Sequence, residues 1–219
     1  MLVLAGILIM VGAILPSLAW LVFFLREDVH PEPKRLIVYV LSLGALSTIP
    51  ALLAQFGIQE LLSVLVVNLP AVVLLAFSEE IFKFLAAWFG VRKNPAFDEP
   101  MDAMIYMVAA ALGFAMIENL FVIGSALEGI SLISFTTASN ILILRFVGAT
   151  FLHVLSSTFV GFYWAQGKTA FGLFVATLVH SAFNYMVLIF PNNNLLYAAL
   201  FLIVAAFFVF QDFEKLKTV

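Results

Sequence analysis

Seven long apolar stretches, separated by short polar breaks, dominate the hydrophobic pattern of the chain. They lie at residues 2–25, 36–57, 61–91, 103–127, 140–166, 170–190 and 195–211. As helices, these stretches are long enough to cross the ~30 Å hydrocarbon core of a bilayer. The breaks hold prolines, glycines and charges, as in Arg26 to Arg35 and Gly57 to Glu60, and Pro70 predicts a kink inside the third stretch. The pattern predicts an all-α, polytopic membrane protein, a bundle of about seven transmembrane helices.

Composition supports this fold class and excludes several functions. Of 219 residues, 64% are hydrophobic and only 11% are charged, more apolar surface than a soluble core of this size could bury. We therefore expect one integral membrane domain over residues 1–219, with the lipid bilayer as a partner. The net charge of −3 argues against a nucleic-acid partner. The absence of cysteine excludes disulfides, thiolate metal ligands and a cysteine nucleophile.

Basic residues predict the orientation of the chain in the membrane. Eight of them fall in the first, third and fifth loops and in the C-terminal tail, at Arg26, Lys34, Arg35, Arg92, Lys93, Lys168, Lys215 and Lys217. Because cytoplasmic segments are enriched in Lys and Arg, we expect an N-terminus outside the cell membrane and a cytoplasmic C-terminus.

The segment Ser78-Glu79-Glu80-Ile81-Phe82-Lys83 places three ionisable side chains inside an apolar stretch. Such residues within a membrane segment usually mark a functional site. On a helix Lys83 lies on the same face as Glu79 and Glu80, but one lysine offsets only one of two carboxylates. The other acid is expected to carry a proton, or to face a wet cavity or a metal ion. A structural ion pair between helices is the alternative.

Further polar residues lie at matching depth on other helices. With a rise of about 1.5 Å per residue, Glu80 lies about 18 Å from the cytoplasmic edge and Glu118 about 15 Å from the outer edge, and His153 and His180 fall near the middle of their stretches. A single site near the bilayer midplane is therefore expected. Neighbouring polar and small residues support it, namely Asn119, Ser157, Asn184, Gly113, Gly148, Ala149, Gly161 and Gly172.

Two other polar groups have competing explanations. Arg145 lies near the outer end of its helix, where contact with lipid headgroups competes with a role in the site. Asp98, Glu99 and Asp102 precede the fourth helix, where carboxylates favour the N-terminal dipole and cap the helix.

These residues suit activation of water better than a serine nucleophile, since no Gly-x-Ser-x-Gly turn is present. In one mechanism Glu79 or Glu80 takes a proton from water while His180 and Asn184 stabilise the oxyanion. In the other, Glu118, His153 and His180 hold a divalent metal such as Zn²⁺, with Glu80 as the base. Both lead to hydrolysis, and the spacing does not separate them.

The motifs, in order along the chain, resemble the PrsW family of intramembrane proteases. The resemblance rests on Glu79-Glu80-x-x-Lys83, Phe97-Asp98-Glu99 leading to Asp102 and Tyr106, Gly113-Phe114-Ala115-x-x-Glu118-Asn119, Arg145 eight before His153, and His180-x-x-x-Asn184. The first loop, Asp28-x-x-Pro31-Glu32-Pro33, is also similar, and the match runs from about residue 16 to 185. The related CAAX prenyl proteases and bacteriocin-processing proteins have a His where this chain has Glu118. Ala103 and Met107 stand where the family pattern has glycines, which weakens the expectation of close backbone approach there.

The resemblance implies a peptidase that cuts a single-pass membrane protein, such as an anti-sigma factor in a bacterial or archaeal cell membrane. Carried over residue by residue, the catalytic set is Glu79, Glu80, Glu118, His153 and His180, and the supporting residues are Lys83, Asn119, Arg145 and Asn184, on helices within about residues 61–190. The family is described as metalloproteases, and relatives are argued to be metal-free glutamate peptidases, so both remain open here.

Two non-protease functions compete with this interpretation. A proton-coupled carrier for a small solute would use the acids and histidines as a relay, but it is expected to show an internal repeat, which the sequence lacks. A non-enzymatic scaffold with the same fold is expected to lack at least one of Glu80, Glu118, His153 and His180, and all four are present.

Overall fold

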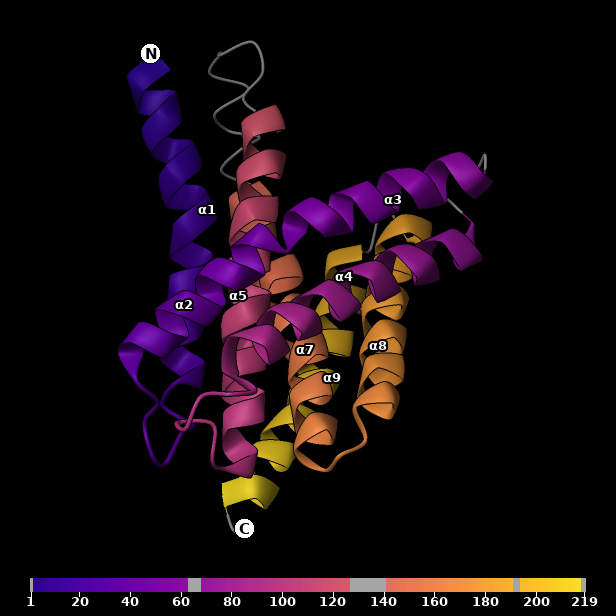
Figure 1. Ribbon diagram of the computed structural model, residues 1–219. Coiled ribbons are helices and arrows are strands. Elements are labelled where there is room, and N and C mark those ends of the chain that lie inside the picture. Colours follow the sequence, from indigo (N-terminus) through magenta and orange to yellow (C-terminus); the bar gives the residue numbers. More distant parts are fainter. Residues whose placement is uncertain (1, 63–67, 127–140, 191–193, 218–219) are drawn as a thin grey trace.

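A computed structural model of the chain describes residues 2–62, 68–126, 141–190 and 194–217. Every regular element in these ranges is helical, which confirms the predicted all-α class (Figure 1). The elements are α1 (Leu2–Phe24), α2 (Lys34–Leu46), α3 (Thr48–Leu62), α4 (Leu69–Val91), α5 (Pro100–Ala126), the π-helix η1 (Arg145–Ala149), α7 (Thr150–Ala165), α8 (Thr169–Ile189) and α9 (Asn194–Lys217).

Helix α5 is the centre of the bundle. All residues from Met101 to Ala115 are buried, and α1, α2, α4, α7 and α9 pack around the helix. A helix that is apolar on every side can be buried on every side, so α5 needs no face directed at lipid or water along this length. The site residues at its far end are thereby fixed relative to the surrounding helices.

Two glycines allow α2 and α5 to cross with their backbones in contact. A Cβ atom on Gly44 would lie 2.1 Å from the carbonyl oxygen of Ala110, and one on Gly113 would lie 1.9 Å from that of Leu41. Small residues permit such close packing between membrane helices. Close approach at the start of α5 comes instead from α7, because a Cβ on Gly161 would lie 2.7 Å from the carbonyl oxygen of Ala103.

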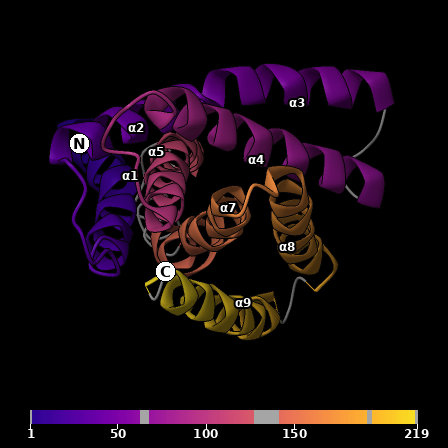
Figure 2. The same ribbon diagram turned by 60° about the horizontal axis from the view of Figure 1, so that its bottom comes forward.

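The second predicted span, 36–57, is two helices that meet at Ser47. The Ser47 and Thr48 hydroxyls donate back to the carbonyls of Gly44 and Ala45, both at 2.7 Å, and Pro50 in the first turn of α3 has no N–H to continue the ladder. The predicted break at residues 57–60 is wrong, since these residues belong to α3. Helix α3 runs beside α4, and both cross the bundle obliquely (Figures 1 and 2).

The third predicted span, 61–91, is described from Leu69 onward as α4. Pro70 lies in the first turn of this helix, where the missing N–H has no intrahelical partner to lose, so the predicted kink is absent. The predicted break at Glu128-Gly129 lies outside the described residues.

Within the described ranges, five helical segments have the length and apolarity to cross a membrane. These are Lys34–Leu61, Pro100–Ser125, Ile141–Ala165, Thr169–Ile189 and Leu196–Lys217, and Met10–Phe24 is a shorter apolar helix. Helix α4 has 23 residues but carries Glu79, Glu80 and Lys83. The chain is a polytopic membrane protein whose charged helix α4 lies among apolar ones.

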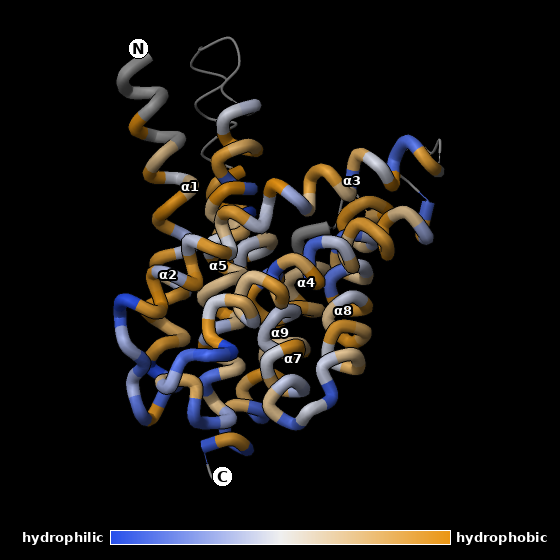
Figure 3. The backbone as a smooth tube through the Cα atoms, in the orientation of Figure 1, coloured by the Kyte–Doolittle hydropathy of each residue, from blue (hydrophilic) through white to orange (hydrophobic). Residues whose placement is uncertain are grey.

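Hydrophilic residues gather at the end of the bundle where the α1–α2, α4–α5 and α7–α8 connections and the C-terminal end of α9 lie (Figures 1 and 3). There Asp102, in the first turn of α5, accepts hydrogen bonds from the backbone N–H groups of Asp98 and Glu99, both at 2.9 Å. Of the three acids expected to cap this helix, Asp102 has that role, reaching back as the acid of a capping box does. The Tyr106 hydroxyl donates to Glu32, so the first loop is fastened to the start of α5.

Candidate catalytic and metal centre

Four helices bring the predicted site residues together. Helix α4 contributes Glu79, Glu80 and Lys83, and α5, α7 and α8 contribute one residue each, namely Glu118, His153 and His180. The matched depths expected from the sequence thus correspond to direct contacts in the structure.

Glu80 is completely enclosed by hydrogen-bond donors. Its side chain has 0% exposure, and Oε1 accepts from Lys83 Nζ at 2.6 Å and from Ser156 Oγ at 2.9 Å. Oε2 accepts from Ser157 Oγ at 2.9 Å, and His180 Nδ1 lies 2.7 Å from Oε1. With both oxygens engaged, Glu80 holds His180 in place and does not line the cavity beside it.

Glu79 has the opposite environment, although it is the preceding residue. Its Oε1 accepts from Gln55 Nε2 at 2.9 Å, while its buried Oε2 has no hydrogen-bond partner among the described residues. Oε2 lies 3.6 Å from His180 Nε2 and 3.9 Å from His153 Nδ1. A buried oxygen left unpaired in this way, beside a cavity, is a position that a ligand or a water molecule can fill.

Each histidine has a carboxylate behind it. His153 Nε2 lies 2.6 Å from Glu118 Oε2, and His180 Nδ1 lies 2.7 Å from Glu80 Oε1, so an N–H on each of these nitrogens can donate to its carboxylate. The other nitrogen of each ring then carries a lone pair on the side of Glu79. Carboxylate, histidine and metal in sequence is the usual outer-shell arrangement of protein metal sites.

Glu79, His153 and His180 together form the cluster that could hold a metal ion, with one ligand atom from each lying within 4.8 Å of the others. Bonds of 2.0–2.1 Å in tetrahedral geometry imply separations of about 3.4 Å between ligand atoms, so the residues fit a divalent ion after small adjustments. This set differs in one member from the expected Glu118, His153 and His180, because Glu118 lies on the far nitrogen of His153.

Lys83 competes with a metal ion for the lone pair of His153. Its ammonium lies 3.1 Å from His153 Nδ1 as well as 2.6 Å from Glu80 Oε1. An ammonium group donates and cannot accept, so Lys83 uses the lone pair that His153 would give to a metal. When a metal ion binds His153 Nδ1, the Lys83 ammonium must give up that nitrogen and keep only its contact with Glu80.

Arg145 points into the protein and not toward lipid headgroups. Its Nη2 lies 2.9 Å from Glu118 Oε2, and its Nε donates to Asn119, whose Nδ2 in turn donates to Thr150 Oγ1 at 3.1 Å. Arg145 begins η1, and π-helical turns inside longer helices occur frequently at functional sites. Arg145 and Asn119 therefore fix the position of Glu118.

A cavity of about 350 Å³ opens beside the cluster and holds Asn184 in its wall. Its lining includes Glu79, Glu118, His153 and His180. Sequence reasoning missed Gln55 and Ser156 and used Ser157 only as a neighbour of His153. The signal for the serines was present, since Ser156 and Ser157 follow His153 by three and four positions and so share its helix face.

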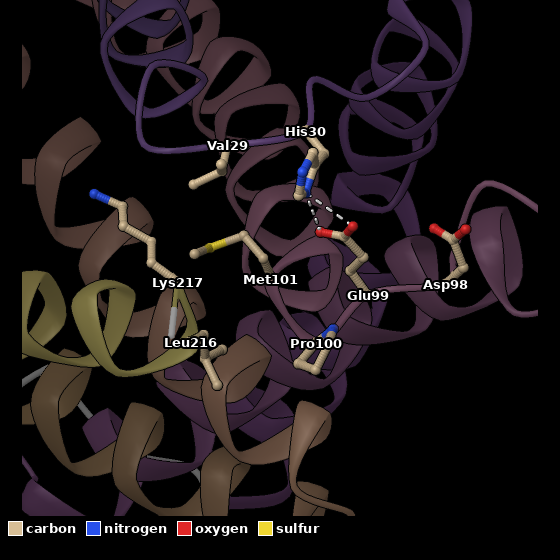
Figure 4. A pocket seen from close by; sticks show the side chains of 8 residues that line it. All are labelled: Val29, His30, Asp98, Glu99, Pro100, Met101, Leu216 and Lys217. Atoms are coloured by element: carbon tan, nitrogen blue, oxygen red, sulfur yellow. Dashed lines mark hydrogen bonds and ion pairs between the residues drawn. The ribbon is translucent and has the colours of Figure 1, made fainter. Parts of the chain in front are cut away.

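A second hollow, of about 310 Å³, lies at the other end of α5 (Figure 4). Its lining includes Pro100, which is about 27 Å along the helix from Glu118. His30 and Glu99 form an ion pair at 2.9 Å there, and Asp98 and Lys217 lie on opposite sides of the view. Because these groups do not converge, the Glu/His cluster is the candidate active site.

Comparison with known proteins gives one consistent family. Residues 32–211 match the model of the PrsW family intramembrane metalloprotease. A Protease PrsW of Oceanobacillus iheyensis is 26% identical over 86% of this chain and 86% of its own length. The Protease PrsW of Halalkalibacterium halodurans is 26% identical over 90% of this chain and 91% of its own length. That of Bacillus subtilis is 23% identical over 95% of each chain. No solved structure gives a significant match. With a buried Glu/His cluster in a helical membrane protein and a family match over most of its length, the chain belongs to the PrsW family of intramembrane metalloproteases and is a peptidase.

Proposed function

We propose that residues 1–219 form a single membrane protease domain that hydrolyses a peptide bond of a single-pass, membrane-anchored protein such as an anti-sigma factor. The observation that carries the proposal is the unpaired Glu79 Oε2, which faces the inner nitrogens of His153 and His180 while each outer nitrogen lies on a carboxylate. A scaffold does not need an unsatisfied buried oxygen beside a cavity.

Glu79, His153 and His180 would hold the metal, and Zn²⁺ suits two imidazoles and one carboxylate. When bound, such an ion polarises the substrate carbonyl and makes water acidic enough to attack it near neutral pH. Glu80 and Glu118 would orient the two histidines, and Lys83 and Arg145 balance the charge of these acids.

The remaining groups of the cavity fit the steps of hydrolysis. The histidine and arginine contacts of Glu118 both fall on Oε2, so Oε1 is available to take a proton from water and return it to the leaving amine. Asn184, in the wall of the same cavity, can donate its amide N–H to the oxygen of the tetrahedral intermediate.

A metal-free glutamate mechanism is the second candidate, favoured by the contact between Lys83 and His153. In this mechanism Glu79 Oε2 takes the proton of the water directly, and its two imidazole neighbours orient that water.

For orientation, we propose an outside N-terminus and a cytoplasmic C-terminus in a bacterial or archaeal cell membrane. The three connections that hold basic residues lie at the same end of the bundle as the C-terminal end of α9 (Figure 1). A shared end for these segments is what the enrichment of Lys and Arg in the cytoplasm requires.

The test is cleavage of a membrane-anchored anti-sigma factor, encoded in the same genome, by the purified chain in liposomes. Wild type and Glu60→Gln, a change at an exposed glutamate of α3, should cut it, whereas His180→Ala should not. If no single-pass protein from that genome is cut by wild type under any metal condition, the proposal fails, and a carrier or scaffold becomes the better explanation.

A further inference from the structure

We infer that the groove between α3, α4 and α5 binds the unwound transmembrane segment of the substrate and leads it to the Glu/His cluster. The inference rests on the proposed protease function. The groove has a volume of about 350 Å³, and its lining includes Leu52, Gln55, Phe56, Glu79, Glu118 and Phe121. Figure 2 shows that α3 and α4, which supply most of the lining, lie on the opposite side of the bundle from α9.

The groove and the catalytic cavity share two lining residues. Glu79 and Glu118 line both of them, so the two carboxylates stand between two spaces of about 350 Å³ each. An extended chain, advancing about 3.3 Å per residue, that continues from the groove into the cavity passes directly beside both acids. This continuity gives the groove a role in the reaction that an isolated surface hollow would lack.

The mouth of the groove is apolar and faces outward. Phe56 and Phe121 are 65% and 59% exposed, and both belong to helical segments of membrane-spanning character. A ligand therefore enters from the hydrocarbon region of the bilayer. Apolar side chains of a membrane-anchored protein match these walls, and an ordinary soluble peptide does not.

The floor of the groove is polar, which distinguishes a peptide from a lipid chain. An unwound peptide in hydrocarbon carries N–H and C=O groups that must find partners. Gln55 offers both an amide donor and a carbonyl acceptor, and Glu79 and Glu118 accept from N–H groups. An acyl chain has no group that would use these side chains.

Gln55 is also the contact that an incoming chain would replace. Its Nε2 donates to Glu79 Oε1 at 2.9 Å, and in the described part of the chain this is the only side-chain hydrogen bond between α3 and a helix other than α2. When Gln55 turns to the substrate backbone, Glu79 Oε1 loses its donor and faces the substrate. Binding in the groove and exposure of the acid thereby occur together.

Disulfide cross-linking tests the groove, and the natural chain has no cysteine to interfere. The variants are Leu52→Cys and Phe121→Cys, and the control is Ile203→Cys on α9, which is 65% exposed. Each is oxidised in membranes with the anti-sigma factor of the cleavage assay, carrying one cysteine in its transmembrane segment. Cross-links at both groove positions and not at Ile203 are expected.

Two outcomes would overturn the groove while leaving the protease function intact. One is a substrate that wild type cleaves but that cross-links equally at all three positions or at neither groove position. The other is a groove cysteine that links to a second copy of the chain in place of the substrate. Cleavage by wild type is measured in the same membranes, so its absence tests the protease function and the cross-linking pattern tests the groove.

Kinetics provide a second measurement that needs no cysteine. Gln55→Leu removes the polar contact to the peptide backbone, and KM is expected to rise roughly 3–10-fold with a smaller change in kcat. Gln59→Leu, an exposed glutamine of the same helix, is the matched control. If the two variants have the same KM, Gln55 does not contact the substrate.

Discussion

Glu79 and Glu80 are neighbours in the chain and have opposite environments. Glu80 is 0% exposed and accepts hydrogen bonds on both oxygens, whereas Glu79, 13% exposed, lines the cavity with an unpaired Oε2. The pair therefore divides into one carboxylate that reacts or binds and one that positions its surroundings.

Glu79→Gln should abolish cleavage and leave the fold unchanged. The amide can still accept from Gln55, but it neither carries charge nor takes a proton, so a loss of roughly 10²–10⁴-fold in kcat is expected. Cleavage rates and thermal unfolding in detergent would be measured beside Glu60→Gln. A Glu79→Gln chain with near-normal kcat would remove Glu79 from the reaction.

Glu80→Gln should lower stability as well as activity. The change leaves the Lys83 ammonium buried without its carboxylate, and breaking a buried ion pair in this way costs about 3–5 kcal/mol. Adding Lys83→Met to Glu80→Gln should recover part of the free energy of unfolding but not cleavage. Wild-type stability with lost activity in Glu80→Gln would instead assign Glu80 to the reaction itself.

Gly113→Ala should destabilise the α2–α5 crossing. The new Cβ would lie 1.9 Å from the backbone oxygen of Leu41, and overpacking of this kind typically costs about 1–3 kcal/mol. Gly124→Ala on the same helix is the control, because its added Cβ would meet no atom of the described residues within 4 Å. Unfolding in detergent distinguishes them, and equal stability of the two variants would show that the helices do not touch at Gly113.

The stability of the folded chain should fall as pH rises, because Glu32 in the first loop loses a proton. Burial, together with the nearby Asp102 and Asp28 carboxylates, raises the pKa of Glu32 to about 8, against its ordinary 4.5, and the Tyr106 hydrogen bond only partly opposes this. The folded chain therefore holds a proton that the unfolded chain releases, so the stabilisation is complete below about pH 4.5 and is lost as pH rises through about 8.

Glu32→Gln should flatten this dependence, because an amide can accept from the Tyr106 hydroxyl and donate to the Asp102 carboxylate at any pH. Melting temperatures of the two chains would be compared at pH 6 and pH 9. The pKa of His30 is also raised, by its hydrogen bond to Glu99. Both chains keep His30, so the difference between them isolates Glu32. Identical pH profiles for wild type and Glu32→Gln would contradict the protonated state of Glu32.

Hydropathy and charge were sufficient to predict the helical membrane fold, because apolar length alone decides which segments can cross a bilayer. They missed the division at Ser47, which depends on hydroxyl back-bonding and Pro50, and they placed a kink at Pro70 where a helix begins. The estimated depths correctly predicted that Glu118, His153 and His180 lie in one layer. Depth does not specify rotation about a helix axis, so which carboxylate faces which nitrogen, and the part played by Gln55, emerged only from the structure.

Metal content of matched variants tests the central claim most directly. Wild type, Glu79→Gln and Glu118→Gln would be purified in detergent, dialysed against Zn²⁺ and analysed by mass spectrometry. The account predicts near-stoichiometric metal in wild type, none in Glu79→Gln, and binding weakened about 10–100-fold in Glu118→Gln, which keeps all three metal ligands and loses the carboxylate that orients His153. Full metal content in Glu79→Gln, or a wild-type chain that cleaves its substrate without metal, would contradict it.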